Sequence, residues 1–198
     1  MSYDRAFWEQ LWAKTLRDHP DKVAQRPPSA HLTAAAAVLP PGRALDAGCG
    51  HGAETLWLAA HGWRVTAVDF SASALAHARS TAEALGPEIA GRIEWVEGDL
   101  GTWTPPREQF DLVVCLFVHI AGSVQELVRR MASGVAPGGT LFMVGHPAAA
   151  GQVQVSVESV IAALDPTEWT IGLAEERPRT IHGTGVDAVS LAIRGRKA

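Results

Sequence analysis

The stretch that most constrains this chain is Ala44–Gly52, which reads ALDAGCGHG. Apolar residues that lead into a turn with glycine at every second position are typical of a buried parallel strand passing into a helix. Glycine is needed where a turn demands positive φ or where backbone must approach a ligand closely. Asp46 begins the turn, and its carboxylate would repel a phosphate but attract an ammonium group. The loop therefore predicts an α/β fold with a site for a cationic ligand group.

Two other glycine-rich loops fit the spacing less well. The dinucleotide-binding loop has the pattern G-x-G-x-x-G, whereas the third glycine here, Gly52, comes one residue early. A P-loop needs a lysine followed by serine or threonine, and no lysine follows Gly52. An NAD-dependent oxidoreductase is thus an alternative that the early glycine and Asp46 both disfavour.

Apolar runs alternate with alanine-rich stretches along the chain. Strands are expected at 43–46, 63–68, 92–96, 110–115, 140–145, 169–175 and 187–193, and helices at 4–18, 29–39, from the glycine loop to 61, 71–85, 123–136 and 156–164. This alternation predicts right-handed crossovers and a doubly wound parallel sheet. The last two strands are joined by a turn-rich loop, so the final strand should run antiparallel. We expect one domain over residues 1–198, with a helical cap region at 1–40 and an α/β core at 41–198.

Composition limits the class of partner and the compartment. The chain has 198 residues, 47% of them hydrophobic, and a formal net charge of −4, so it carries no overall basic footprint for nucleic acid or an anionic membrane. No apolar run is long enough to span a bilayer, and the first residues lack a signal-peptide layout. Only Cys49 and Cys115 are present, in no CxxC arrangement, which favours the cytoplasm.

Three acidic residues follow the first three expected strands. Asp46, Asp69 and Asp99 come at or just after the ends of these strands, where ligands bind in open α/β sheets. A carboxylate at Asp69 can accept hydrogen bonds from both ribose hydroxyls, and one at Asp99 can accept from an adenine amine. Each acid alone could instead cap a helix or form a turn. Together they predict an adenosine-binding site.

Five motifs in order resemble those of the class I S-adenosylmethionine-dependent methyltransferases. They are 46–52 (motif I), 65–71 (motif II), 97–100 (the adenine-binding segment), 110–114 (motif IV) and 136–141 (the turn that opens strand five). The resemblance implies a Rossmann-like, doubly wound seven-stranded sheet in the order 3-2-1-4-5-7-6, with strand 7 antiparallel and helices on both faces. It also implies S-adenosylmethionine as the cofactor and S-adenosylhomocysteine as the product. The cofactor-binding residues that it implies are Asp46, Ala47, Gly48, Cys49, Gly50, Gly52, Asp69, Phe70, Asp99, Leu100 and Cys115.

The tryptophan-rich start and the Gly-His-Pro after strand five are similar to small bacterial methyltransferases of the tellurite and thiopurine type. Motif IV continues as CLFVH through His119 and lacks the N-P-P-aromatic tetrad of enzymes that methylate nucleobases or glutamine amides. The expected reaction is therefore methyl transfer to an oxygen, sulfur or nitrogen atom of a small molecule. A non-catalytic protein that binds S-adenosylmethionine or adenosine for regulation or interaction is the alternative.

Two histidines are candidate general bases. His119 follows strand four and His146 follows strand five, and a histidine there can deprotonate a hydroxyl or thiol near neutral pH. A lone histidine near a strand end is more often a structural residue, and this is the alternative for both. His51, His119 and His146 lack the close spacing of a metal site, so we expect no metal. The oligomeric state is left open.

Six residues are candidates for contacting the methyl acceptor: Trp8, Trp12, Phe117, Arg177, Arg179 and His182. The two tryptophans lie on one face of the first helix, where they would either pack in the core or cover the cofactor as a lid. The expected loop 177–183 would present its arginines to an anionic substrate, or would be an ordinary solvated hairpin.

Overall fold

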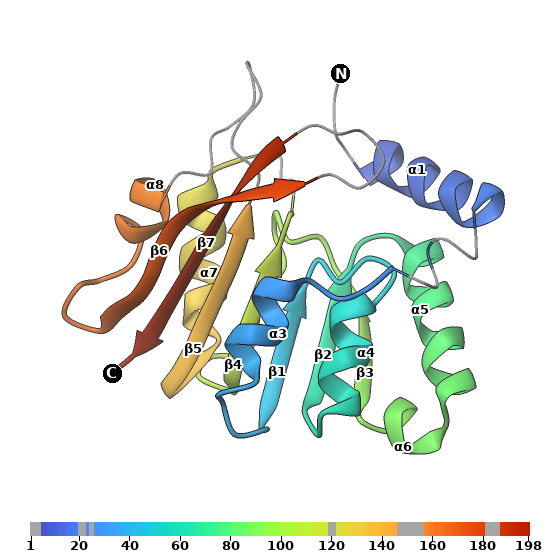
Figure 1. The fold of residues 1–198 in the computed structure, drawn as a ribbon, viewed down its shortest axis with the longest axis horizontal. Helices are drawn as coiled ribbons and strands as arrows, with labels where there is room; N and C mark the ends of the chain where they lie inside the picture. The colour runs from blue at the N-terminus through green and yellow to red at the C-terminus, as the bar shows by residue number, and fades with distance from the viewer. Residues whose placement is uncertain (1–4, 20–22, 24–25, 119–121, 146–156, 181–186) are drawn as a thin grey trace. The chain divides into compact units, whose positions relative to one another are not determined.

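The computed structural model describes residues 5–19, 23, 26–118, 122–145, 157–180 and 187–198, without the side chains of 175–180 and 187–192. The strands are β1 (Arg43–Ala47), β2 (Arg64–Asp69), β3 (Ile93–Glu97), β4 (Phe110–Leu116), β5 (Val135–Gly145), β6 (Trp169–Thr180) and β7 (Asp187–Lys197). The helices are α1 (Arg5–Asp18), α3 (Ala30–Ala36), α4 (Ala53–Ala60), α5 (Ala72–Leu85), α6 (Pro87–Ala90), α7 (Val124–Ser133) and α8 (Val157–Ile161), as Figure 1 shows.

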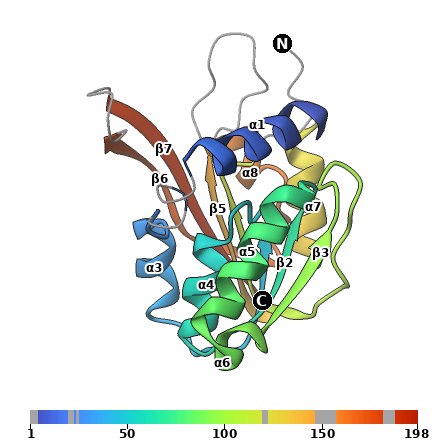
Figure 2. The ribbon, with the colours of Figure 1, turned by 90° about the vertical axis from the view of Figure 1, so that its right-hand side faces the viewer.

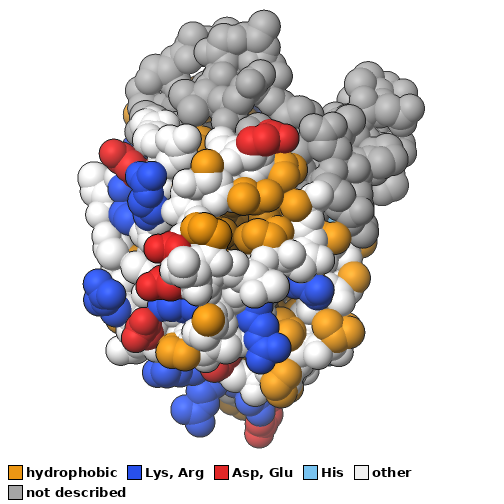
Figure 3. All heavy atoms as spheres, turned by 90° about the vertical axis from the view of Figure 1, so that its left-hand side faces the viewer, with side chains coloured by type: hydrophobic (Ala, Val, Ile, Leu, Met, Phe, Trp, Pro, Cys, Tyr) orange, Lys and Arg blue, Asp and Glu red, His pale blue; other side chains and the backbone are white. Residues whose placement is uncertain are grey.

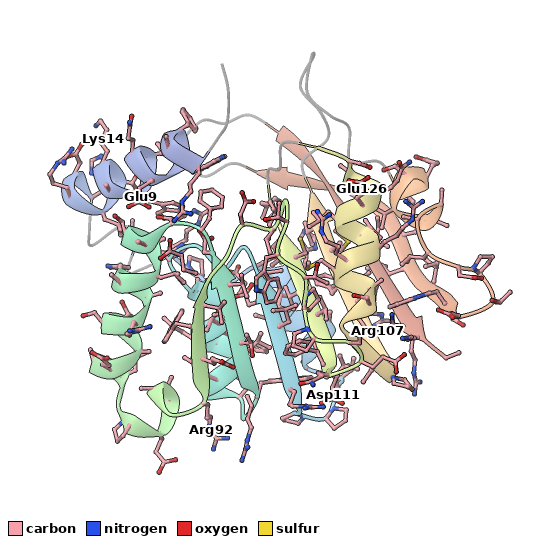
Figure 4. The ribbon with its side chains drawn as sticks, turned by 180° about the vertical axis from the view of Figure 1, so that it is seen from behind. Glu9, Lys14, Arg92, Arg107, Asp111 and Glu126 are labelled. Carbon is pink, nitrogen blue, oxygen red and sulfur yellow. The ribbon has the colours of Figure 1, made fainter. Side chains whose placement is uncertain are left out.

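The seven strands form one sheet in the order β3-β2-β1-β4-β5-β7-β6, as predicted. The pairs β1–β2, β2–β3 and β4–β5 are parallel, whereas β7 runs antiparallel to both β5 and β6. Helices flank the sheet. In the first unit α4 packs against β1 and β2 (Figure 1), and in the second unit α7 packs against β5 (Figure 4). The predicted Rossmann-like topology is confirmed.

The chain clusters into two compact units, one of Met1–Trp103 with His119–Ala121 and one of Thr104–Val118 with Gly122–Ala198. The expectation of one domain with a cap region at 1–40 and a core at 41–198 stays a prediction. None of the described helices is long and apolar enough to cross a membrane. On the face drawn in Figure 3, charged side chains of both signs are interspersed with hydrophobic ones over the described surface.

The first unit is built on the parallel strands β1, β2 and β3. Their inward residues are apolar, and Cys49, Ala67 and Leu75 form a buried cluster against which Ile93 and Trp95 pack. Figure 2 shows α4 and α5 on the same side of these strands. Two strand-to-helix turns, after β1 and after β2, therefore lie at the same edge of the sheet, which is where α/β folds bind ligands.

The start of α5 agrees with its predicted cap. The Ser71 hydroxyl accepts a hydrogen bond from the Ala74 N–H at 3.1 Å, which satisfies one of the free donors at the helix start. Gly86 then ends the helix, but Pro87 opens the short helix α6 before β3. Proline suits the first position of a helix because its missing N–H would be unsatisfied there anyway.

The second unit corrects two predicted boundaries. Strand β5 begins at Val135 instead of 140, because a register shift on β4 between Phe110 and Leu112 accommodates the Pro-Gly-Gly turn inside the ladder. Strand β6 continues to Thr180 and pairs with β7 along this length, so Arg177 and Arg179 lie in a strand and not in the expected loop. At the other end of this hairpin, Lys197 contacts Glu108 at 2.7 Å.

Candidate functional site

The glycine loop between β1 and α4 adopts backbone conformations that favour glycine. Gly48, Gly50 and Gly52 have φ values of 83°, 51° and 85°. The N–H groups of Gly48 and Cys49 both donate to the carbonyl of Val68, so the loop is tied to the end of β2. The alternating glycines of the sequence therefore correspond to a tight turn, with no side chains at Gly48, Gly50 and Gly52, at the carboxyl edge of the sheet.

Asp46 lies at the end of β1 with 2% of its surface exposed. The Thr55 hydroxyl donates to its Oδ2 at 2.6 Å. Burial, and after it the neighbouring charges of Glu54 and Asp69, raise the pKa of Asp46 to about 7. Because these neighbours are themselves acidic, the site around Asp46 would gain from a bound cation and would repel an anion.

Asp69 ends β2 and links the two strand-to-helix turns. Its two carboxylate oxygens accept from the N–H groups of Gly50 and Ser71, each at 2.9 Å. Burial raises the pKa of Asp69, although these backbone hydrogen bonds oppose the shift. The backbone N–H of Phe70 also contributes a hydrogen bond. A carboxylate has about four acceptor sites, so Asp69 can still accept a hydrogen bond from a ligand hydroxyl.

Asp99 follows β3 and is exposed. Its Oδ1 accepts from the Gly101 N–H at 2.8 Å, which is the geometry of a turn former. The adjacent Leu100 is buried, and Phe70, after β2, is half-buried. Asp99 can form this turn and still accept a hydrogen bond from adenine, because only its Oδ1 is engaged by the Gly101 N–H.

Helix α1 covers the glycine loop. A Cβ atom added at Gly50 would lie 2.9 Å from Cζ2 of Trp12, and the Trp12 ring is 5.6 Å from the His51 ring between centroids. Trp8 and Trp12 are both half-buried, and no residue of α1 is fully buried. Trp12 thus packs on the loop backbone at Gly50, and its role as a lid or as a core residue stays a prediction.

Polar contacts hold α1 to the edge of the sheet. Glu9 accepts from the Ser73 N–H at 3.3 Å and also from the Ser73 hydroxyl. Hydrogen bonding from the hydroxyls of Ser71 and Ser73 lowers the pKa of Glu9. Arg5 forms an ion pair with Glu97 at the end of β3. Figure 4 shows Glu9 on the side of α1 that faces α5, with Lys14 on the outer side.

In the second unit, Cys115 and Phe117 mark the end of β4. Cys115 is buried and is not part of a disulfide bond. Phe117 has φ of 55°, and its N–H donates to the carbonyl of Val144 at 2.7 Å. An aromatic residue in the left-handed region costs about 1–3 kcal/mol, and such strain concentrates at functional sites.

Several predicted site residues are outside the described part of the chain. His119, His146 and His182 lie there, as do the side chains of Arg177 and Arg179. Among the described residues, no group of three or more His, Cys, Asp or Glu side chains is arranged to hold a metal ion. The roles predicted for the three histidines and for the two arginine side chains therefore stay predictions.

Sequence reasoning missed Thr55 and Glu9. Thr55 lies one turn into α4, and its polarity within an otherwise apolar helix was the available signal. Glu9 lies four residues after Arg5 and three before Trp12, so helical spacing places all three near one face. Their contacts with Asp46 and Ser73 join positions 9 and 64 residues apart, which local patterns do not encode.

Comparison with known proteins agrees with this geometry. A family profile described as a methyltransferase domain matches residues 44–139. The crystal structure of TehB from Haemophilus influenzae has the same fold, with a TM-score of 0.73 at 17% identity over 93% of this chain and 66% of that one. Together with the seven-stranded topology and the glycine loop, this profile match and this fold support a class I S-adenosylmethionine-dependent methyltransferase.

Two curated relatives differ widely in what they methylate. A phosphatidylethanolamine N-methyltransferase from Cereibacter sphaeroides is 33% identical over 138 residues, which cover 69% of this chain and 66% of that protein. The ribosomal RNA small subunit methyltransferase C of Alcanivorax borkumensis is 36% identical over 112 residues, which cover 54% of this chain and 33% of that protein. The chain therefore spans one third to two thirds of the length of these relatives.

The residues present fit the family's cofactor, S-adenosylmethionine. Its ammonium group suits the buried Asp46 carboxyl, whose charged neighbours are acidic. The left-handed Gly48 and Gly50 leave bare backbone beside this carboxyl. At the end of the neighbouring strand, Asp69 retains lone pairs for ribose hydroxyls. The acceptor groups at the two turns thus suit the ammonium group and the ribose hydroxyls of the cofactor.

Proposed function

We propose that this protein binds S-adenosylmethionine at the β1 and β2 turns and transfers its methyl group to a small molecule. The observation that carries the proposal is the Asp46 carboxyl, which is buried beside the glycine loop among other acids. A buried acid in such surroundings is costly unless a cation neutralises it. The ammonium group of the cofactor would supply that cation.

The chain's own contribution would be binding and orientation. Asp46 would hold the ammonium group, and Gly48, Cys49 and Gly50 would approach the amino-acid portion through their backbone. Asp69 would accept hydrogen bonds from the ribose hydroxyls, and Asp99 would accept one from the adenine amine. The other proposed cofactor-binding residues, which would line or support the site, are Ala47, Gly52, Phe70, Leu100 and Cys115. When bound, the cofactor supplies an electrophilic methyl group with a built-in leaving group, so positioning is the main requirement for transfer.

A small-molecule acceptor is supported by the charge and by motif IV. The net charge of −4 is unfavourable for a polyanionic substrate such as RNA. The chain has CLF at 115–117, without the tetrad that positions nucleobases in related enzymes. Trp8, Trp12 and Phe117 would contribute apolar contacts, and Arg177, Arg179 and His182 would favour an anionic acceptor.

A base would be needed only for an acceptor that must lose a proton. His119 follows β4 by three positions and His146 directly follows β5, so both are placed in the sequence after strands of the second unit. A histidine can accept a proton near neutral pH. We propose His119 first and His146 second for this role.

The test is a transfer assay with the full chain and S-adenosylmethionine labelled in its methyl group. The acceptors are a panel of phenols, thiols, amines and small carboxylates, with RNA as a separate arm. The proposal predicts label in at least one small acceptor, and a loss of about 100-fold in rate for His119→Ala if that residue is the base. Label only in RNA would contradict the small-molecule assignment.

A non-catalytic role is the second candidate. Trp12 of α1 packs on Gly50 and so covers one side of the glycine loop. A cofactor bound at the loop would therefore contact or displace α1, and a regulatory protein could respond to the cofactor in this way. This role predicts tight binding of S-adenosylmethionine with no transfer to any member of the panel. Calorimetry performed beside the transfer assay separates the two candidates.

A further inference from the structure

A second pocket lies beside the glycine loop but uses none of the residues assigned to the cofactor. Its volume is about 250 Å³, and its walls come from α4, α5, His51 of the glycine loop, and the three residues Val23, Arg26 and Pro28. These elements all belong to the first unit. The pocket therefore occupies the helical side of this unit, whereas the acids Asp46, Asp69 and Asp99 lie at the carboxyl ends of the strands.

The polar lining of this pocket is basic. Arg26, His51 and His77 all line it, and the described lining contains no acidic side chain. The Arg26 charge is close enough to His51 to help lower the pKa of that imidazole, although burial is the larger cause. These side chains come from three separate segments, so their convergence is a product of the fold.

His51 has a buried ring nitrogen, Nε2, without a hydrogen-bond partner among the described residues. Burial lowers the pKa of His51 to about 4, so the ring is neutral at pH 7 and can donate one N–H. A buried polar atom without a partner costs free energy, which a ligand oxygen at this position would recover.

The remaining walls are apolar. Leu56, Trp57 and Leu85 line the pocket, and Leu85 is one of the few large hydrophobic side chains that are exposed. The Trp57 ring stacks on His61 with centroids 3.9 Å apart, so the indole is held in a fixed orientation. A rigid aromatic wall next to an exposed leucine suits a flat, apolar ligand body.

We propose that this pocket is a binding site for a small organic anion with an aromatic or aliphatic body, separate from the cofactor site. The guanidinium of Arg26 and the imidazoles of His51 and His77 would contact the anionic group. Leu56, Trp57 and Leu85 would contact the apolar body. The volume of about 250 Å³ limits the ligand to about one or two rings.

The experiment is titration calorimetry of the full chain with 1-naphthoate, compared with the neutral isostere 1-naphthamide. The protein is saturated with S-adenosylhomocysteine in one series and free of it in the other. We expect naphthoate to bind in both series and to bind about tenfold or more tightly than naphthamide, because a charge-assisted hydrogen bond is lost in the amide. The variant Arg26→Gln should weaken naphthoate about tenfold and leave naphthamide unchanged.

Arg79→Gln is the matched control, since Arg79 is an exposed arginine on α5 that does not line the pocket. It should leave naphthoate binding unchanged. Thr81→Leu adds bulk to the pocket wall and should remove binding of both probes. The proposal is overturned if naphthoate does not bind, if both arginine variants have equal effects, or if S-adenosylhomocysteine displaces naphthoate.

Discussion

Two opposing effects act on the carboxyl group of Asp46. Burial and the nearby acids raise its pKa to about 7, while the hydrogen bond from Thr55 favours the ionised form. Its ordinary pKa is near 4. Around neutral pH, Asp46 is therefore ionised in part of the ligand-free molecules, and its buried charge destabilises them. An ammonium group bound beside the carboxylate would offset this destabilisation.

This carboxyl group makes stability depend on pH in a defined direction. Because its pKa is raised in the folded state, folding is favoured below about pH 4 and loses this contribution as the pH rises to about 7. Relative to Asp46→Asn, the free energy of unfolding of the wild type should fall across this window. Urea unfolding at several pH values measures the difference. Glu83→Gln, on the exposed surface of α5, is the control for the loss of one carboxylate.

Gly50 provides a second prediction at the residue scale. Its φ of 51° and the 2.9 Å approach of Trp12 mean that Gly50→Ala adds both backbone strain and a steric clash. We expect a destabilisation of about 2 kcal/mol, part of which Trp12→Ala should relieve in the double variant. Gly62→Ala has a similar φ of 89° but only ordinary contacts, so it isolates the strain. Additive effects of the Gly50 and Trp12 changes would contradict the proposed packing.

At the scale of elements, α1 depends on polar contacts more than on burial. It contains no fully buried residue, and the Glu9–Ser73 hydrogen bonds and the Arg5–Glu97 ion pair connect it to α5 and β3. Elements with little buried apolar surface open locally at low free-energy cost. Helix α1 is therefore the part of the first unit that we expect to respond to a ligand in the glycine loop.

Hydrogen exchange tests this view of α1. Glu9→Ala should raise the exchange rate of α1 amides about fivefold, since a hydrogen bond to a charged group contributes about 1 kcal/mol or more. The global free energy of unfolding should change little. Lys14→Ala is the matched control, because Lys14 lies on the outer side of the same helix and pairs only with the exposed Asp18 among the contacts shown. An equal increase in α1 amide exchange in Glu9→Ala and Lys14→Ala would show that the Glu9 hydrogen bonds do not hold α1 in place.

At the scale of the whole molecule, the strands and helices were predictable because their determinants are local, whereas the strand order is what the family resemblance implied. Apolar runs, helix caps such as Ser71 and the turn after β1 each specify an element, and the chirality of crossovers then restricts their order. The long β6 and the early start of β5 were not predictable. Pro178 and the glycines at 138 and 139 indicate turns. The pairing of Pro178 with β7, and of Val135 and Thr140 with β4 on either side of the Pro-Gly-Gly turn, depends on partners distant in sequence.

The site residues that lie at strand ends were predictable from the sequence, because ligands bind at the carboxyl ends of parallel strands. Asp46, Asp69 and the three glycines were found by position alone. The partners of these residues were not, because Thr55, Glu9 and Arg26 reach their contacts only after the chain has folded. For Asp99 the sequence allowed a turn former or a ligand acceptor, and the turn is the role visible in the fold.

The most direct test of the central claim is a comparison of two ligands by titration calorimetry on the full chain. S-adenosylhomocysteine carries the amino-acid group, and methylthioadenosine lacks it. We predict that Asp46→Asn weakens S-adenosylhomocysteine about tenfold or more and changes methylthioadenosine little, while Asp69→Ala weakens both. Absence of S-adenosylhomocysteine binding to the wild type, or equal effects of Asp46→Asn on the two ligands, would contradict the account.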